Sequence, residues 1–184
     1  MKPVRVGLVG LGTVGAGVFR TLRDNHDEIV RRVGCDIVVT MACRRDLARA
    51  RAVVGDQLRL TTDPMEVITS PDVDVVVELM GGLDPAHELV LAAIAAGKHV
   101  VTANKALLAV HGNEIFAAAQ ERGVMVAFEA AVAGGIPIIK ALRESLAANR
   151  IEWIAGIING TTNFILSQMR DKGVNFEEAL AEAQ

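Results

Sequence analysis

Short apolar runs alternate along this chain with segments in which apolar residues recur every third or fourth position. Apolar, β-branched runs are typical of parallel strands that are buried on both faces. Helical spacing, together with capping residues, indicates helices between those strands. The expected strands cover residues 4–9, 36–42, 73–79, 98–102 and 124–128. The expected helices cover residues 14–33, a short segment entered through residues 44–51, a segment capped by Asp63-Pro64, and residues 85–96 and 113–122.

The alternation weakens after Phe128, where residues 130–136 are rich in glycine and alanine. The pattern beyond them predicts a helix, a strand that holds the only tryptophan, and a second helix, over residues 137–148, 150–158 and 161–172. Asn175 then caps a last helix, with Glu178 in the capping-box position, and that helix still runs at Gln184.

This change of pattern predicts two domains. Strands that alternate with helices through short turns form a parallel sheet with helices on both faces, so we expect a doubly wound α/β domain over residues 1–136. The mixed pattern beyond predicts the start of a second, α+β domain over residues 137–184. A chain that stops inside a fresh amphipathic helix looks truncated, so we expect this second domain to be incomplete.

Composition narrows the class of protein. With 51% hydrophobic residues, a chain of 184 residues can build a stable core. The net charge of −3 gives no basic excess that would attract nucleic acid or acidic lipid. No run of about 18 apolar residues could span a membrane, and the N-terminus lacks the apolar core of a signal peptide. The two cysteines, Cys35 and Cys43, are too few for a disulfide framework or a zinc site. We therefore expect a cytoplasmic protein that binds neither nucleic acid nor membranes.

A glycine-rich turn follows the first expected strand and opens the first expected helix. Its residues are Gly10, Leu11, Gly12, Thr13, Val14 and Gly15. In this context the first glycine permits a tight turn, the second lets a pyrophosphate approach, and the third lets helix and strand pack closely. The helix N-terminus adds unpaired N–H groups and a partial positive charge. We expect a Rossmann-type dinucleotide site here; a turn that serves packing alone is the alternative.

Two arginines that follow the second expected strand bear on the choice of dinucleotide. Asp36 lies about 20 residues past Gly15, as the carboxylate that binds the ribose of NAD usually does, but it begins the strand and so belongs to the wrong edge of the sheet. Arg44 and Arg45 follow the strand at the correct edge, where a guanidinium can hold a 2′-phosphate. The sequence therefore favours NADP. Either arginine could instead stack on adenine, which leaves NAD usable, or both could be solvated.

Two further segments end strands at the same edge, where open α/β sheets hold their ligands. One is Thr102-Ala103-Asn104-Lys105, in which Lys105 can place a compact charge or a proton near a substrate oxygen. The other is Gly81-Gly82, which is small enough to let the backbone approach the nicotinamide end of a cofactor. A solvated lysine and a plain turn are the alternatives.

Two polar segments lie further along the chain. Glu129 precedes a glycine-rich stretch, and one carboxylate with free carbonyls suits a monovalent cation, although a tight turn explains the glycines equally well. The second segment opens a helix and offers amide, hydroxyl and N–H groups to a small polar substrate, or simply caps that helix. Its residues are Asn159, Gly160, Thr161 and Thr162. Three histidines have no spacing that suggests a metal site or a catalytic triad: His87, His99 and His111.

Taken in order, four motifs make the chain resemble the homoserine dehydrogenase family over essentially its whole length. They are Gly-Leu-Gly-Thr-Val-Gly at 10–15, Val-Thr-Ala-Asn-Lys at 101–105, Glu-Ala-Ala-Val-Ala-Gly-Gly-Ile-Pro at 129–137 and Gly-Ile-Ile-Asn-Gly-Thr-Thr-Asn at 156–163. The last two are the more specific, since many dehydrogenases share the first. The resemblance implies the reduction of aspartate 4-semialdehyde to homoserine with NADPH or NADH, in the biosynthesis of threonine and methionine.

The resemblance also implies roles for particular residues. It makes Arg45 the 2′-phosphate ligand of the arginine pair, and it places Lys105 at the nicotinamide and the substrate. It turns the stretch after Phe128 into a sodium site, whose ligands are Glu129 and the backbone carbonyls of Val132, Gly134 and Ile136. The polar segment from Asn159 to Thr162 then borders the substrate pocket. The family tends to dimerise through a sheet, so we expect a homodimer that pairs residues 150–158.

One departure from the family is large. Its members continue with a segment that carries a substrate-binding Glu, a substrate-contacting Asp and a catalytic Lys, and none of these follows Gln184. We therefore expect this chain to bind the dinucleotide without turning over homoserine. Two other interpretations stay open: another NAD(P)-dependent oxidoreductase of this fold, such as an amino-acid or imine reductase, and a dinucleotide-binding module without activity.

Overall fold

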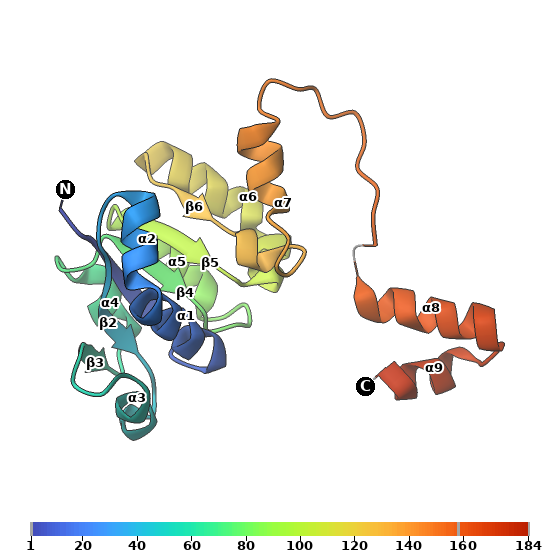
Figure 1. Ribbon diagram of the computed structural model, residues 1–184, viewed down its shortest axis with the longest axis horizontal. Helices are drawn as coiled ribbons and strands as arrows, with labels where there is room; N and C mark the ends of the chain where they lie inside the picture. The colour runs from blue at the N-terminus through green and yellow to red at the C-terminus, as the bar shows by residue number, and fades with distance from the viewer. Residues whose placement is uncertain (1, 158, 184) are drawn as a thin grey trace. The chain divides into compact units, whose positions relative to one another are not determined.

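Six parallel strands form the sheet of the first compact unit, Met1–Ala141, in the order β3-β2-β1-β4-β5-β6 (Figure 1). The computed structural model describes residues 2–157 and 159–183. The strands are β1 Val4–Val9, β2 Ile37–Cys43, β3 Arg59–Thr61, β4 Val75–Glu78, β5 His99–Thr102 and β6 Val126–Ala127. The strand order reverses between β1 and β4, which confirms the doubly wound sheet that the sequence predicts. Strand β3 is the one that the apolar pattern missed, since it is only three residues long.

Helices cover both faces of this sheet and enclose two separate cores. They are α1 Thr13–Asp24, α2 His26–Val33, α3 Leu47–Val54, α4 Pro64–Thr69, α5 Ala86–Ala95, α6 Lys105–Arg122 and α7 Ile138–Lys140, with a 3₁₀ turn η1 at Glu129–Ala131. Successive strand residues point to opposite faces. Leu8 packs with residues of α1 and α3, and Val9 packs with residues of α4, α5 and α6. Because both faces are buried over residues 6–9, this part of β1 holds no charged side chain on either face.

Several helices begin and end where local capping chemistry predicts. The Asp63 carboxylate accepts the N–H of Met65 at 2.8 Å and opens α4, with Pro64 as its first residue. Gly34 and Gly123 end α2 and α6 in the left-handed conformation that glycine adopts most easily. These helix starts and ends depend on contacts between residues that are close in sequence, so the sequence alone predicts them.

Two helices within residues 1–136 differ from their predicted extents. The predicted helix over residues 14–33 is interrupted at Asn25, which separates α1 from α2. The helix predicted from residue 113 begins at Lys105 instead and runs for 18 residues. The Asn104 side chain starts it by accepting the N–H of Leu107 at 3.1 Å. Gly112 does not end this helix, because it lies on the buried face where a small residue packs well.

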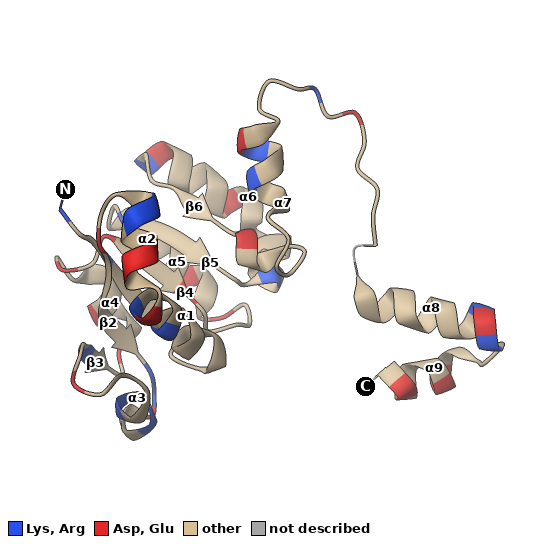
Figure 2. Cartoon of the chain, viewed as in Figure 1, with Lys and Arg blue, Asp and Glu red and all other residues tan. Residues whose placement is uncertain are grey.

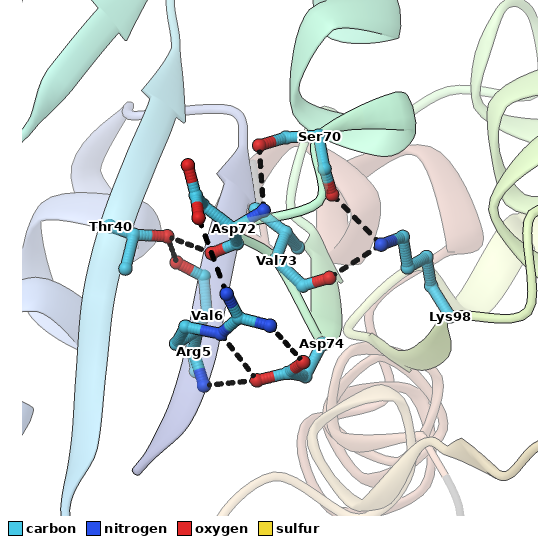
Figure 3. Close-up of polar contacts among 8 residues, drawn as sticks. All are labelled: Arg5, Val6, Thr40, Ser70, Asp72, Val73, Asp74 and Lys98. Atoms are coloured by element: carbon cyan, nitrogen blue, oxygen red, sulfur yellow. Dashed lines mark hydrogen bonds and ion pairs between the residues drawn. The ribbon is translucent and has the colours of Figure 1, made fainter. Parts of the chain in front are cut away.

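A polar cluster joins β1, β2 and β4 at the amino-terminal edge of the sheet (Figure 3). The Arg5 guanidinium donates to both oxygens of Asp74, at 2.8 and 3.0 Å, and the Arg5 N–H donates to the same carboxylate at 2.9 Å. The bonds from Arg5 lower the pKa of Asp74 to about 2. Nearby, the Lys98 ammonium donates to the carbonyls of Ser70 and Val73 at 2.8 and 2.6 Å. This cluster is structural, because ligands bind such sheets at the opposite edge.

The second compact unit, Leu142–Gln184, contains the helices α8 Gly160–Lys172 and α9 Phe176–Ala183. Both were predicted, and Asn175 opens α9 by accepting the N–H of Glu178 at 2.9 Å. The predicted strand is wrong over residues 150–157, which have no regular structure, and Ile158 lies outside the described residues. A strand forms only beside another strand, and no described residue pairs with this segment. The predicted helix over residues 137–148 is shorter, as α7 is followed by a π-helical turn η2, Ala141–Ser145.

Acidic and basic residues are interspersed, and α2 and α6 each carry both signs (Figure 2). Among the described helices, none is long and apolar enough to cross a membrane. Cys35 and Cys43 are both free thiols, and burial raises the pKa of the Cys43 thiol, which keeps it neutral.

Candidate functional site

The glycine turn between β1 and α1 has the geometry of a phosphate cradle. Gly10 has a φ of +109°, and a β-carbon there would lie 2.9 Å from the backbone of Leu79. A β-carbon on Gly15 would collide with the Gly10 carbonyl oxygen, so these two positions require glycine. At Gly12 a β-carbon would meet no atom within 4 Å, which leaves open space in front of the turn.

The first turn of α1 suits a negatively charged group. Within the described residues, Gly12 provides no side-chain cap for this helix, and its first turn holds no acidic residue. The N–H groups at the helix start therefore remain available to an anion. Thr13 and Val14 of this turn are exposed, whereas Leu11 is buried beneath it. The turn thus combines open space with unpaired donors, as a pyrophosphate requires.

The two arginines after β2 make different contacts. The Arg44 guanidinium donates to the carbonyl oxygen of Leu11 at 2.6 Å and so braces the glycine turn. Arg45 is exposed, and no partner for its guanidinium is recorded among the described residues. Asp36 lies at the other end of β2, where its carboxylate is 3.1 Å from Nε2 of His26. The prediction that Asp36 lies at the wrong edge is therefore confirmed.

A buried carboxylate that the sequence did not single out lies at the same edge as the glycine turn. Glu78 ends β4 with 1% of its surface exposed. Its Oε2 accepts the Thr102 hydroxyl at 2.7 Å, and its Oε1 accepts the Met80 N–H at 2.8 Å. The available signal was a charged residue that closes a run of three consecutive valines, in strand Val75–Glu78.

Thr102 and Lys105 face different surroundings although they belong to one motif. Thr102 is fully buried, and its hydroxyl bonds Glu78 rather than facing the ligand edge. Asn104 is also buried and donates from Nδ2 to the carbonyl of Gly82 at 2.6 Å. Lys105 is exposed as the first residue of α6. The structure thus brings Gly81-Gly82 and Lys105 together through Asn104.

The loop after β6 exposes carbonyl groups next to a carboxylate. Each Glu129 oxygen accepts one backbone N–H at 2.9 Å, from Ile139 and from Lys140, and so caps α7. Ala133 and Gly134 both have left-handed backbone conformations, with φ of 55° and 61°. The carbonyls of Val132 and Gly134 accept no backbone N–H in the part of the chain that the structure describes, whereas that of Ile136 accepts the Ile138 N–H at 2.8 Å.

The four residues predicted to border the substrate pocket lie in the second unit. Asn159 caps α8, because its Oδ1 accepts the N–H of Thr162 at 2.9 Å. Gly160 and Thr161 form the first turn of this helix, and both are exposed. The exposed first turn therefore still offers hydroxyl and N–H groups for binding.

The histidines come closer together than their spacing indicates. His87 on α5 and His111 on α6 stack with ring centroids 3.8 Å apart, and Nε2 of His87 lies 2.8 Å from a Glu114 oxygen. The ligand atoms of these three residues lie within 4.8 Å of one another. However, the two ring planes differ by only 15°, so their lone pairs run side by side and one ion cannot lie in both planes. The contact therefore joins two helices and does not form a metal site as it stands.

A family model described as the NAD-binding domain of homoserine dehydrogenase matches residues 10–129. This chain belongs to the homoserine dehydrogenase family. A second model, described as homoserine dehydrogenase, matches residues 137–184. The homoserine dehydrogenase of Pseudomonas aeruginosa is 62% identical over 100% of this chain and 42% of its own length. That of Neisseria gonorrhoeae is 59% identical over the same shares. The chain thus spans about two fifths of the length of these relatives.

Solved structures of homoserine dehydrogenases have the same fold. One from Thiobacillus denitrificans superimposes with a TM-score of 0.89 at 66% identity, over 100% of this chain and 42% of that chain. A hyperthermophilic archaeal homoserine dehydrogenase, solved in complex with NADPH, gives a TM-score of 0.77 at 30% identity, over 99% of this chain and 60% of that chain. A dinucleotide fits the cradle described here, because the space in front of Gly12 is open and the first turn of α1 presents unpaired N–H groups.

Proposed function

We propose that this protein is a homoserine dehydrogenase that interconverts homoserine and aspartate 4-semialdehyde in threonine and methionine biosynthesis, with NADP as its preferred cofactor. The observation that carries the proposal is that a phosphate cradle and an exposed lysine lie at the same edge of the sheet. The open cradle at Gly12 can hold a pyrophosphate, and the exposed Lys105 follows β5 at the same edge. In doubly wound sheets this edge holds both the cofactor and the reacting part of the substrate.

The reaction moves a hydride and a proton between two molecules. Reduction adds a hydride to the aldehyde carbon and a proton to its oxygen, and oxidation of homoserine removes both. A bound nicotinamide supplies or accepts the hydride. Lys105, at the start of α6, can donate a hydrogen bond to the aldehyde oxygen and so favour the charge that develops there. Its ammonium is a compact donor that suits this role.

The preference for NADP rests on the two arginines. Arg44 is committed to the Leu11 carbonyl, whereas the exposed Arg45 is available for a 2′-phosphate. A guanidinium binds phosphate through two parallel hydrogen bonds, which a ribose hydroxyl cannot match. We therefore assign the 2′-phosphate to Arg45. Gly81 has a left-handed φ of 74° and lies in the loop that would approach the nicotinamide end.

A sodium ion belongs to this proposal as well. The free carbonyls of Val132 and Gly134 suit a monovalent cation, and the left-handed turn between them brings such groups close together. Glu129 would serve as a ligand while it caps α7, because a carboxylate offers about four lone pairs and two are used. Ile136 completes the proposed set. We also propose a homodimer, cytoplasmic residence, and a substrate pocket bordered by residues 159–162.

The decisive experiment measures two properties separately. The 184-residue chain is titrated with NADPH, and the whole protein is assayed for oxidation of homoserine with NADP⁺. We expect NADPH to bind the chain and homoserine to be oxidised by the whole protein. Binding without oxidation in the whole protein would make it a dinucleotide-binding module instead. Oxidation of another amino acid in preference to homoserine would make it a different oxidoreductase.

A further inference from the structure

We propose that Glu78 is a positioning residue. A closed ring of hydrogen bonds that begins at its carboxylate sets the separation between the loop at residues 80–82 and the first turn of α6. The ring thereby fixes Lys105 against the bound dinucleotide. This inference rests on the proposed function, since the separation matters only if the loop and Lys105 act on one reaction.

The ring closes through three side chains and two segments of backbone. Glu78 accepts the N–H of Met80 at 2.8 Å and the hydroxyl of Thr102 at 2.7 Å. The Thr102 oxygen accepts the N–H of Asn104 at 3.0 Å. Asn104 Nδ2 then donates to the carbonyl of Gly82 at 2.6 Å, which returns the ring to the loop where it began. Each bond therefore restricts the same two segments of chain.

Asn104 connects this ring to Lys105. Its Oδ1 accepts the N–H of Leu107 at 3.1 Å and caps α6, and Lys105 is the next residue. Asn104 cannot shift without moving the start of that helix, because one side chain holds both the helix and the loop. Lys105 is exposed, and within residues 2–157 and 159–183 its ammonium makes no hydrogen bond or ion pair. Its position therefore depends on the bonds of Asn104.

Burial argues that the ring has a purpose beyond filling space. Glu78, Thr102 and Asn104 are 1%, 0% and 7% exposed. In the same layer of the sheet, Glu78 is in register with Val9, and Val9 with Cys43, both apolar and buried. An apolar residue would fill this layer at lower cost, because burying a carboxylate loses its hydration. In this layer β1 and β2 hold apolar residues, whereas β4 and β5 hold the polar Glu78 and Thr102. The polar pair lies next to the loop and Lys105, whose separation it fixes.

The test variants act on the middle of the ring. Thr102→Val keeps the shape of the side chain and removes its hydroxyl, whereas Thr102→Ser keeps the hydroxyl and should restore the ring. Glu78→Gln keeps the shape but turns an amide N–H₂ toward either the Thr102 hydroxyl or the Met80 N–H. The matched control is Thr61→Val. Like Thr102, Thr61 is buried at the end of a strand, and its hydroxyl oxygen accepts the backbone N–H of the second residue after it, Asp63, at 3.0 Å. Thr61 lies outside the ring.

Hydrogen exchange tests the ring without any turnover. In the 184-residue chain, Thr102→Val and Glu78→Gln should each speed exchange of the Met80 and Asn104 amides about tenfold or more, and Thr102→Ser should not. Thr61→Val should leave these two amides unchanged. Equal effects of Thr61→Val and Thr102→Val would show a general loss of stability, and would overturn the proposal.

Kinetics in the whole protein test the positioning. Thr102→Val and Glu78→Gln should each lower kcat for homoserine oxidation about 10- to 100-fold, because small misplacements of a reacting group are costly. The KM for NADP⁺ should change less than about threefold, and Thr102→Ser should restore kcat. An unchanged kcat in a protein with faster exchange would overturn the positioning role alone. A wild-type protein that binds NADPH but does not oxidise homoserine would instead overturn the proposed function, and the inference with it.

Discussion

Residues that are close together in this sequence differ in burial and in hydrogen bonding. Arg44 and Arg45 follow the same strand, yet Arg44 braces the glycine turn while Arg45 is exposed. Thr102 and Lys105 belong to one motif, yet the threonine is buried and the lysine is not. Proximity in sequence therefore does not decide burial or hydrogen-bond partners.

Replacing Arg45 with glutamate should discriminate between the two dinucleotides. The change exchanges a charge-assisted hydrogen bond for repulsion, so NADPH should bind the 184-residue chain about 10- to 100-fold more weakly, while NADH loses little. Arg44→Glu is the control, because loss of the bond to Leu11 disturbs the turn and should weaken both dinucleotides alike. Fluorescence titrations with NADPH and NADH give the dissociation constants. Equal losses from Arg45→Glu would mean that this residue does not bind the 2′-phosphate.

Replacing Lys105 with alanine should affect the reaction rather than the cofactor. In the whole protein we expect kcat for homoserine oxidation to fall about 100-fold or more, as for a positioned acid or base. NADPH affinity should stay within about tenfold. Steady-state kinetics and NADPH titration of the same preparation separate the two effects. A variant that only raises the KM for NADP⁺ would make Lys105 a binding residue.

The residue scale also shows where sequence reasoning stops. The sequence predicts the glycine turn, the position of Asp36 at the amino end of its strand, and the position of Lys105 after its strand. Each of these depends on a single strand or turn. The role of Glu78 could not be predicted, since its partner Thr102 lies 24 residues away on another strand. Their contact depends on the register of β4 with β5, in which Glu78 faces Thr102, and no local pattern specifies that register.

At the scale of elements, the close packing of α1 against β1 decides whether the cradle exists. The helix approaches the strand so closely that Gly15 lies against the Gly10 carbonyl. Two helix starts illustrate what local signals can predict. Asp63 and Pro64 fix the start of α4, whereas Asn104 starts α6 eight residues before the sequence pattern indicates. The sequence pattern missed the first eight residues of α6, which end at Gly112.

Two glycines of α1 make a matched pair for testing this packing. Gly15→Ala should cost about 1–3 kcal/mol of stability by overpacking and weaken NADPH binding about tenfold or more. Gly17→Ala should stabilise the chain by about 0.5–1 kcal/mol and leave binding unchanged, because its β-carbon meets no atom within 4 Å. Denaturant unfolding and NADPH titration measure the two quantities. If both variants behaved alike, the Gly15–Gly10 contact would not be what shapes the cradle.

The bonds between Arg5 on β1 and Asp74 before β4 predict a pH dependence. Asp74 has a folded-state pKa of about 2, below the ordinary value of 3.8. Its contribution to stability is therefore complete above pH 3.8 and is lost as the pH falls through 2. Asp74→Asn should lower stability at neutral pH and flatten its fall between about pH 4 and 2. The effect should be modest, since the Asp74 side chain is 40% exposed. Urea unfolding at several pH values measures the free energy of unfolding of each variant. Asp56→Asn is the control, because the Asp56 side chain is 97% exposed. Parallel stability curves for wild type and Asp74→Asn would contradict the prediction.

At the scale of the whole molecule, the chain divides into a sheet domain and a shorter second unit. The sheet domain has a core on each face, which explains why its strands and helices could be predicted from apolar spacing. The second unit could be predicted only in part, because α8 and α9 carry their own caps whereas residues 150–157 need a partner strand. In this segment Trp153, Ile154 and Ile157 are 78%, 67% and 75% exposed.

Trp153 provides a direct test of the proposed homodimer. If two copies pair through residues 150–157, the single tryptophan should pass from water into an interface. Its emission should then shift to shorter wavelength as the protein concentration rises, in step with the dimer mass from sedimentation equilibrium. Trp153→Ser should weaken dimerisation. A dimer in which the tryptophan emission stays that of an exposed indole would place the interface elsewhere.

The strand order has a consequence for redesign. Arg45 follows β2 on one side of β1, whereas Glu78 ends β4 and Lys105 follows β5 on the other side. Under the proposed function, the residue that selects the cofactor and the residue that acts on the substrate therefore lie on opposite sides of one central strand. The proposal implies that short replacements after Cys43 change cofactor preference while the ring at Glu78 stays intact. Evolution or engineering could then alter the two properties one at a time.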